Sequence, residues 1–238
     1  MLIDGFDYPP ALMMTYNPAY YPRLVESCGF AKEKDLFAFL VDGTYRVPEW
    51  LDSLAGRMAQ KKGIHIRGFR LKDPAPDVAL IREIFNDCWS GNWGYVPVSD
   101  NESLEVGKFM VKIGDPDLAF FIYYEDEPAG VCVVLPDINP LLKRLNGRIG
   151  LLGLLKVLIY RREITGLRGL IFGIKEKYRQ LGLPILAFRH LYDVVRKKEK
   201  YRYMEMGWTL EDNESINFLI EEGGARIHKK YSIFRKSL

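Results

Sequence analysis

The stretch Tyr178-Arg179-Gln180-Leu181-Gly182-Leu183-Pro184 joins a β-run, Arg168 to Ile174, to a helical pattern, Ile185 to Arg196. Apolar residues recur at helical spacing in the second segment. Pro184 suits the first turn of that helix, where an N–H has no intrahelical partner. Gly182 lets the backbone turn tightly before the helix. The stretch therefore predicts a strand that runs through a glycine turn into a helix.

Two groups of segments flank this stretch. Before it, the pattern indicates a strand, two amphipathic helices and a β-hairpin, and Ser99 and Glu102 form a capping box before the second helix. After it come an alternating strand, a short helix that ends at Gly223-Gly224, and a last strand. The predicted segments are Ile64 to Leu71, Asp77 to Trp89, the helix after Ser99, Leu118 to Tyr124, Gly130 to Leu135, Tyr201 to Leu210, Glu214 to Glu222 and Arg226 to Phe234.

The beginning of the chain repeats the order of its end. An apolar strand at Met13 to Asn17, a helix around Tyr20 to Ser27 and a strand from Asp35 to Val41 parallel the C-terminal strand, helix and strand. A chance likeness of so loose a pattern is the alternative. Pro48 opens an amphipathic helix typical of a connector. The predicted domains are a partial one over 1–45, a connector helix over 46–63 and a complete domain over 64–238, with an insertion at about 137–166.

The N-terminal part, Met1 to Val41, is too short to complete a sheet by itself. An unpaired strand edge of this length favours aggregation, so we expect its strands to pair with something outside it, and a second copy of the chain is the expected partner. The sequence thus predicts a homo-oligomer through this part.

Composition excludes several classes of protein. The chain has 34 Lys and Arg against 31 Asp and Glu, and a net charge of +3 is too small for nucleic-acid binding through bulk charge. Its 3 His and 3 Cys leave little material for metal sites, disulfides or histidine triads. No run approaches the ~20 apolar residues of a membrane span, and Asp4 and Asp7 interrupt any secretory leader. We expect a cytoplasmic protein that binds neither metal nor nucleic acid.

The order of elements from Ile64 to Leu238, together with the turn Arg179 to Pro184, resembles the GNAT superfamily of N-acyltransferases. The resemblance implies an α/β fold with a mixed, mostly antiparallel twisted sheet flanked by helices. With a partial GNAT-like half-domain in front, the chain is similar to the C-terminal part of a tandem-GNAT protein.

The resemblance implies an acyl-coenzyme A site at the turn. In the family an Arg/Gln-x-x-Gly-x-Gly/Ala turn holds the pyrophosphate on backbone N–H groups, where orphan amides and the helix dipole favour an anion. A main-chain N–H near Gly173 or Ile174 is expected to polarise the thioester carbonyl. The co-substrate is acetyl-coenzyme A or another acyl-coenzyme A, held by Gly173, Ile174, Arg179, Gln180, Leu181, Gly182, Leu183 and Asn213.

Two residues depart from the family pattern. Pro184 replaces the last small residue of the turn and offers no N–H to a phosphate. Ile220 replaces the tyrosine that protonates the leaving thiolate in the family, so Tyr231 or Tyr178 is left for that role. The alternative for the turn is a strand-to-helix connection that uses glycine and proline for geometry alone.

Glu205 is the candidate general base. It lies in the middle of the strand Tyr201 to Leu210, where a partly desolvated carboxylate has a raised pKa and can take a proton from an amine. Its alternative is a solvent-facing residue on a half-exposed strand. Asn213 matches the asparagine that follows this strand in many family members. The predicted catalytic residues are Glu205, Asn213 and Tyr231.

The loop Asn92 to Tyr95 is the candidate acceptor site. It lies between the first two helices of the complete domain, where the family places its acceptor loop, and aromatic residues on a glycine-containing loop favour a binding partner. The alternative is a loop that folds back onto its own core. The predicted acceptor-binding residues are Asn92, Trp93 and Tyr95, across one cleft from Glu205.

The insertion from Leu141 to Arg162 interleaves basic and apolar residues. It is too short and its flanks are too basic for a membrane span. It either packs as a lid over the cofactor slot or makes a weak contact with a membrane surface.

The leading function is therefore transfer of an acyl group from acyl-coenzyme A to a small-molecule or peptide amine, by direct attack. Two alternatives stay open. One is a catalytically degenerate GNAT-fold protein that binds a ligand or acts as a scaffold. The other is an aminoacyl transferase of a related tandem fold, which needs a basic groove.

Overall fold

The computed structural model describes residues 1–145, 157 and 159–237, and its contacts divide the chain into two compact units. The first unit comprises Met1–Arg46, Asp137–Arg168 and Tyr201–Leu238, and the second comprises Val47–Pro136 and Gly169–Lys200. Strand β6 (Gly166–Ile174) begins in the first unit and ends in the second. The predicted domains, with boundaries at 45 and 63, are continuous stretches of the chain, whereas each observed unit consists of several separate segments.

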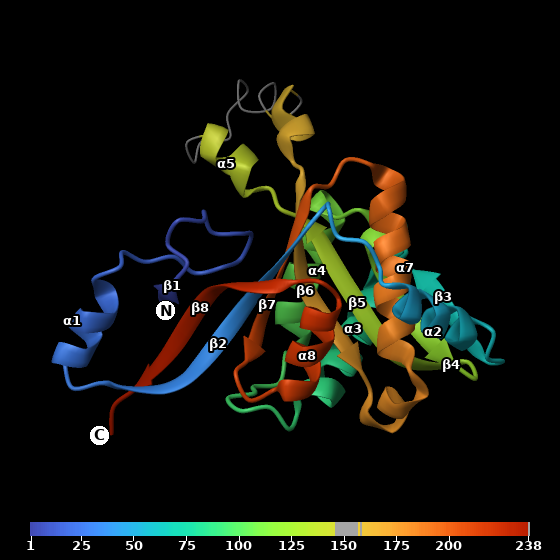
Figure 1. The fold of residues 1–238 in the computed structure, drawn as a ribbon, viewed down its shortest axis with the longest axis horizontal. Coiled ribbons are helices and arrows are strands. Elements are labelled where there is room, and N and C mark those ends of the chain that lie inside the picture. Colours follow the sequence, from blue (N-terminus) through green and yellow to red (C-terminus); the bar gives the residue numbers. More distant parts are fainter. Residues whose placement is uncertain (146–156, 158, 238) are drawn as a thin grey trace. The chain divides into compact units, whose positions relative to one another are not determined.

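The first unit is built on a long central strand, β2 (Ala31–Asp42). It pairs antiparallel with β7 (Tyr203–Leu210) on one side and with β8 (Arg226–Arg235) on the other, as Figure 1 shows. The short strand β1 (Leu2–Asp4) adds to the free edge of β8. The remaining elements of this unit are α1 (Tyr21–Ser27), α5 (Asn139–Leu145), η2 (Arg161–Glu163) and α8 (Glu214–Glu222).

The N-terminal strands find their partners within the chain. We expected the strands of Met1 to Val41 to pair outside that segment, and they do, but with the C-terminal strands β7 and β8 rather than with a second copy. The unpaired edge that motivated a homo-oligomer is therefore absent from the described residues of β2. Oligomeric state itself stays a prediction.

The predicted strand at Met13 to Asn17 is wrong, because this segment is a loop in the structure. The side chain of its last residue, Asn17, binds the backbone of Leu2. Asn17 accepts from the Leu2 N–H through Oδ1 at 2.7 Å and donates to the Leu2 carbonyl through Nδ2 at 3.1 Å. The likeness between the two ends of the chain is thus limited to α1 and β2.

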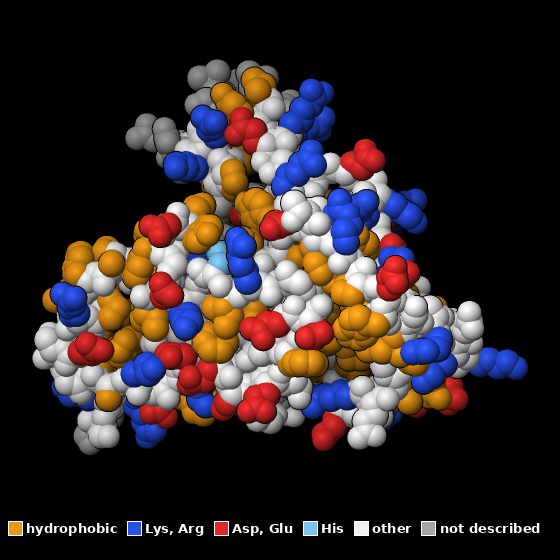
Figure 2. All heavy atoms as spheres, viewed as in Figure 1, with side chains coloured by type: hydrophobic (Ala, Val, Ile, Leu, Met, Phe, Trp, Pro, Cys, Tyr) orange, Lys and Arg blue, Asp and Glu red, His pale blue; other side chains and the backbone are white. Residues whose placement is uncertain are grey.

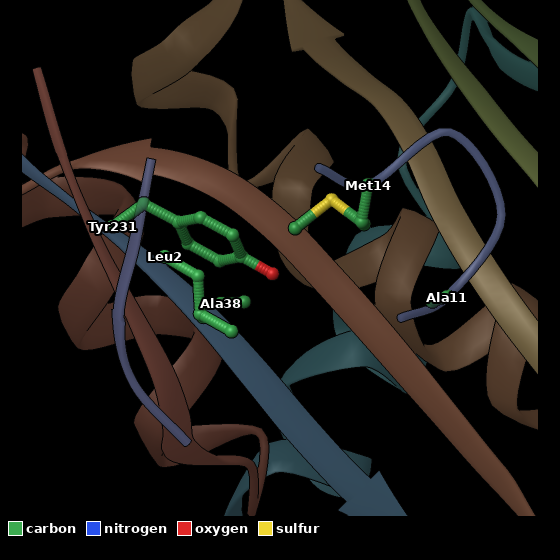
Figure 3. Packing of buried hydrophobic residues seen from close by; sticks show 5 residues of the cluster. All are labelled: Leu2, Ala11, Met14, Ala38 and Tyr231. Carbon is green, nitrogen blue, oxygen red and sulfur yellow. The ribbon is translucent and has the colours of Figure 1, made fainter. Parts of the chain in front are cut away.

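The N-terminal loop also supplies part of the core of this unit. Leu2, Ala11 and Met14 pack against Ala38 of β2 and Tyr231 of β8, with Phe6 and Leu36 at the margin (Figure 3). Burial of these side chains, each worth about 1.5–3 kcal/mol for a large apolar residue, holds the N-terminal segment on the sheet.

Replacing Asn17 with alanine tests this arrangement. Both backbone groups of buried Leu2 lose their partner, and a buried polar group left unsatisfied costs about 1–3 kcal/mol. Urea unfolding is expected to show a loss of that size. The exposed Asn101→Ala serves as the control and is expected to change stability by less than about 0.5 kcal/mol. Equal effects of the two replacements would contradict a stabilising role for the hydrogen bonds between Asn17 and Leu2.

The second unit follows the predicted order of elements. Glu125 and Asp126 both have positive φ, of 48° and 66°, which is the geometry of a two-residue hairpin turn between β4 and β5. Ser99 caps α4 in the predicted capping box with Glu102. Its elements are α2 (Glu49–Ala59), β3 (Ile64–Gly68), α3 (Ala75–Trp89), α4 (Asp100–Ile113), η1 (Pro116–Leu118), β4 (Ala119–Tyr124), β5 (Glu127–Pro136), η3 (Glu176–Leu181) and α7 (Leu183–Lys198).

The strands of the second unit form an antiparallel ladder of β3, β4 and β5. Helix α3 packs on β5 and α4, and α2 packs on α7, so the predicted connector helix is part of this unit. Gly107 of α4 allows the close approach to α3, because a Cβ there would lie 2.5 Å from Cγ2 of Val78. The α/β class of the predicted fold, with helices beside a largely antiparallel sheet, agrees with this element order.

The insertion falls partly outside the described residues. Arg148, Lys156 and most of its leucines lie outside the described residues, so the lid and the membrane contact both stay predictions. Leu141, Leu145 and Ile164 form a small buried cluster with Ile138, Val157 and Tyr160 at its margin. Across the described part of the chain, no helix is both long and apolar enough to cross a membrane.

Candidate functional site

Glu205 points into the interior of the first unit. Its side chain is only 4% exposed, and Oε2 accepts from Nζ of Lys229 at 2.6 Å and lies 2.8 Å from Nε2 of His228. The predicted alternative, a solvent-facing residue, is therefore wrong. A carboxylate in so dry a place needs partners of this kind, because an unpaired buried charge is very costly.

The charge state of Glu205 differs from the expectation. Burial pushes the pKa of Glu205 up, but the contacts with His228 and Lys229 lower it by more, and the pKa ends below its ordinary value of 4.5. The predicted raised pKa is wrong, because the sequence pattern showed burial but not the two partners on the next strand. Glu205 is therefore ionised at neutral pH.

A β-bulge brings these partners together. Along β8, Lys229 pairs with Ala38 of β2 but the next pair is Ile227 with Phe39, so His228 is the extra residue. Alternate residues of a regular strand point to opposite faces, whereas a bulge re-aims one side chain. His228 and Lys229 can thus both reach Glu205. The loss of alternation at one residue is not visible in the sequence.

The N-terminal loop covers this group. Nζ of Lys229 also donates to the Pro9 carbonyl at 2.8 Å, and the ring of Tyr8 lies edge-on to His228 with centroids 5.1 Å apart. Two further residues tie the loop down. The Leu12 N–H donates to Oδ1 of Asp137 at 3.1 Å, and Nε of Arg168 donates to the Leu12 carbonyl at 3.3 Å. Sequence reasoning found none of these residues.

More titratable groups surround the carboxylate. Burial raises the pKa of Asp137 and lowers that of Arg168. Burial, with the nearby Asp137 and Glu205 carboxylates, raises the pKa of Tyr203 to about 12. Such a concentration of perturbed groups is typical of functional sites, although ion-pair networks also produce it.

Tyr231, the predicted proton donor, belongs to the same region. It is 1% exposed, packs edge-on to Trp208, and has a pKa raised first by burial and then by the Glu205 charge. It therefore keeps its proton at neutral pH. Asn213 is half-buried at the start of α8, and its carbonyl accepts from the Asn217 N–H at 3.0 Å. The catalytic roles of both residues stay predictions.

Four polar atoms of Glu205, His228 and Tyr231 lack a hydrogen bond of regular geometry among the described residues: Oε1 of Glu205, both ring nitrogens of His228 and the hydroxyl of Tyr231. Nε2 of His228 nevertheless lies 2.8 Å from Oε2 of Glu205. Buried polar atoms are nearly always paired with protein, water or ligand. The group around Glu205 therefore has spare capacity to bind a polar molecule.

The predicted coenzyme A turn lies in the second unit. Gly182 has a φ of +77° and immediately precedes α7, and Pro184 stands in the first turn as predicted. Nε of Arg179 donates to the Ile174 carbonyl at 3.2 Å, while Gln180 is exposed. A Cβ at Gly182 would lie 2.7 Å from Sδ of Met58. A bulky residue at Gly182 would thus strain the backbone as well as the site.

The strand before the turn is tightly enclosed. A Cβ at Gly173 would lie 2.6 Å from Cζ3 of Trp89, and a Cβ at Gly130 would lie 2.7 Å from the Gly173 carbonyl oxygen. Gly173 and Ile174 are both buried. Glycine is required here by close packing, whatever the strand binds.

The predicted acceptor loop exposes its tryptophan. Trp93 is 43% exposed, Asn92 and Tyr95 are half-buried, and Gly94 has a φ of +70°. Trp93 therefore does not fold fully onto the core. Glu205 belongs to the first unit and this loop to the second, so the common cleft stays a prediction.

A groove of about 670 Å³ lies elsewhere in the second unit, along α3. Two of its three arginines, Arg67 and Arg70, bind the fully buried carboxylate of Asp77, at 2.9 and 2.7 Å, and the third, Arg82, pairs with Asp100. This arrangement anchors α3 on β3. Across the part of the chain that the structure describes, no group of His, Cys, Asp and Glu could hold a metal ion.

Replacing Glu205 with glutamine tests its charge state. Since the folded pKa lies below 4.5, the carboxylate contributes stability that is present above pH 4.5 and lost as pH falls through the folded pKa. The difference in unfolding free energy between wild type and Glu205→Gln is expected to shrink below pH 4.5. The exposed Glu222→Gln is the control. A difference that grows on acidification would contradict the assigned ionisation.

Comparisons with known proteins agree on the fold. No protein-family model matches the chain. Among solved structures, it resembles a GCN5-related N-acetyltransferase from Sphaerobacter thermophilus, with a TM-score of 0.59 and 16% identity over 92% of this chain and 56% of that one. It also resembles a tandem GNAT protein from the clavulanic acid biosynthesis pathway, with a TM-score of 0.56 and 12% identity over 94% and 60%. The predicted resemblance to the GNAT fold is confirmed.

Two curated proteins align with the whole chain. A bacterial ceramide synthase of Caulobacter vibrioides is 32% identical over 248 aligned positions, and protein YghO of Escherichia coli is 30% identical over 247. The alignments cover all of this chain but 63% and 62% of those proteins. The chain thus spans less than two thirds of the length of the curated relatives it matches.

Proposed function

We propose that the chain carries out N-acyl transfer from a fatty acyl-coenzyme A to the amino group of a long-chain lipid amine. The observation that carries this proposal is the alignment of the whole chain, at 32% identity, with a bacterial ceramide synthase. A ceramide is the amide of a fatty acid with a long-chain base. The GNAT fold is one that catalyses such amide formation, so fold and relative support the same reaction class.

The donor is proposed to bind at the turn before α7. The N-terminus of a helix attracts anions, and Gly182 keeps the backbone open to a pyrophosphate. Arg179 and Gln180 are exposed beside it and add donors. Pro184 removes one N–H from the first turn, so the proposed site relies more on these side chains than the family pattern does.

The acceptor is proposed to bring its amine toward the region of Glu205. That carboxylate is ionised at neutral pH, buried, and surrounded by polar atoms with spare hydrogen-bonding capacity. Attack on the thioester carbonyl requires the amine to lose a proton, and a buried anion supports that loss. Trp93 and Tyr95 belong to the second unit, and their predicted role in binding the acceptor stays a prediction.

A second candidate function is a GNAT-fold binding protein without catalysis. Ile220, at the position of the family's tyrosine, is 4% exposed and packs in the core, so α8 supplies no hydroxyl there. Aminoacyl transfer remains a further alternative for which no specific observation speaks.

Direct product analysis tests the proposed function. Purified protein is incubated with palmitoyl-coenzyme A and a long-chain amino alcohol, and amide and free coenzyme A are quantified by mass spectrometry. Equal amounts of both are expected, with acetyl-coenzyme A a poorer donor. Donor binding without any amide from lipid or small-molecule amines would favour the binding-protein alternative.

Replacing Arg179 tests the proposed donor site. Arg179→Ala is expected to weaken binding of palmitoyl-coenzyme A roughly 10-fold in calorimetric titration, because a charged hydrogen bond to phosphate is worth about 1.5–3 kcal/mol before solvent screening. The control is Lys108→Ala, an exposed lysine on α4. Unchanged affinity in Arg179→Ala would place the phosphates elsewhere.

A further inference from the structure

The β-bulge in β8 places His228 beside Glu205, and the proposed function assigns this histidine no role. Its side chain is 4% exposed, and its Nε2 lies 2.8 Å from Oε2 of Glu205. Neither ring nitrogen makes a hydrogen bond of regular geometry among the described residues, and only the tautomer protonated at Nε2 can donate to the nearby carboxylate. The other ring nitrogen, Nδ1, then holds a free lone pair.

That lone pair is unused within the described residues. Nδ1 of His228 is buried and lacks a hydrogen-bond partner there, as does Oε1 of Glu205. The arrangement of a carboxylate behind an imidazole whose far nitrogen is open is the one that makes histidine an efficient proton acceptor. Nζ of Lys229, in contrast, donates to both Glu205 and the Pro9 carbonyl.

We propose that His228 is the general base that takes the proton from the acceptor amine, and that Glu205 is the positioning residue behind it. This proposal rests on the proposed function and assigns its proton transfer to a residue on β8. Lys229 binds the same carboxylate oxygen, Oε2, at 2.6 Å and so helps to fix the position of Glu205.

The chemistry balances without a further reactant. The neutral amine forms a C–N bond to the acyl carbonyl carbon, the C–S bond of acyl-coenzyme A breaks, and coenzyme A leaves as a thiolate. The proton that the nitrogen loses goes to Nδ1 of His228, and the imidazolium then returns it to the thiolate. Glu205 stays ionised throughout and stabilises the intermediate imidazolium.

The N-terminal loop lies against the imidazole ring of His228. The ring of Tyr8, which is 41% exposed, stands edge-on to His228 at 5.1 Å between centroids. Displacing one partly exposed tyrosine is a small rearrangement compared with opening the sheet. The acceptor is therefore inferred to reach His228 past Tyr8.

The titratable groups that face this pair come from several elements. They are Glu205 and Tyr203 on β7, Lys229 and Tyr231 on β8, Arg168 on β6, Asp137 after β5 and Tyr8 in the N-terminal loop. Replacing His228 alone leaves all of them in place, so its effect on a pH profile can be separated from theirs.

The test is a set of three variants: His228→Asn, Glu205→Gln and the double replacement. His228→Asn is expected to lower turnover at least roughly 100-fold, the usual scale for losing a general base, with donor affinity unchanged. The acid limb of the pH–rate profile is expected to disappear with it. The double variant is expected to be no slower than His228→Asn alone, because Glu205 acts through His228. His65→Asn, on exposed β3, is the matched control.

Retention of wild-type turnover and of the acid limb in His228→Asn would overturn the assignment while leaving the proposed function intact. Multiplicative losses in the double variant would also overturn it, because they indicate separate roles. Thermal unfolding of each variant shows whether a loss of turnover reflects a loss of fold.

A readout without turnover separates this proposal from the proposed function. The chain has only 3 histidines, so ring-proton NMR signals can be assigned by the His228→Asn and His65→Asn variants. Addition of a long-chain amine is expected to shift the His228 signal and leave that of His65 in place. If wild type produces no amide but the shift occurs, His228 still contacts the amine and only the reaction class fails. If the His228 signal does not shift when the amine is added, the proposal fails whatever the protein's activity.

Discussion

The contact between Lys229 and Glu205, 2.6 Å long and almost wholly buried, is the constraint on which the first unit depends. Either charge alone would be costly there, since removing one partner of a buried ion pair typically costs about 3–5 kcal/mol. Lys229 therefore fixes the register of β8 against β7 across the central strand β2. The same lysine holds the Pro9 carbonyl and so ties the N-terminal loop to the sheet.

One bulge converts this structural pair into a candidate site. A regular strand would send His228 to the opposite face from Lys229, where it would meet neither Glu205 nor Tyr8. With the bulge, the carboxylate of Glu205 contacts both Lys229, which stabilises the fold, and His228, whose Nδ1 has no partner among the described residues. The proposed acyl transfer needs such a group next to a place where an amine can lose a proton. Glu205 thus has two roles: its ion pair with Lys229 stabilises the unit, and its contact with His228 belongs to the proposed site.

The sequence predicted what depends on local pattern. The turn at Gly182, the capping box at Ser99 and the hairpin at Glu125-Asp126 follow from spacing and backbone preferences, and all three are present. It did not predict what depends on distant contacts. The role of β2 between β7 and β8, the loop over Glu205 and the bulge at His228 join residues far apart along the chain. Glu205 itself was found from its place in a strand, but its ionisation was misjudged because its partners lie on another strand.

The ionised carboxylate of Glu205, in contact with both Lys229 and His228, is the feature on which the proposed site depends. The NMR chemical shift of its carboxyl carbon reports its ionisation directly. In a ¹³C NMR titration of the folded protein, with the signal assigned through Glu205→Gln, the Glu205 resonance should show its titration midpoint below pH 4.5, since the partners hold its pKa under the ordinary value. Lys229→Met should move that transition to higher pH. A Glu205 signal that titrates above pH 4.5 in wild type would contradict the assignment of a buried carboxylate held by Lys229 and His228.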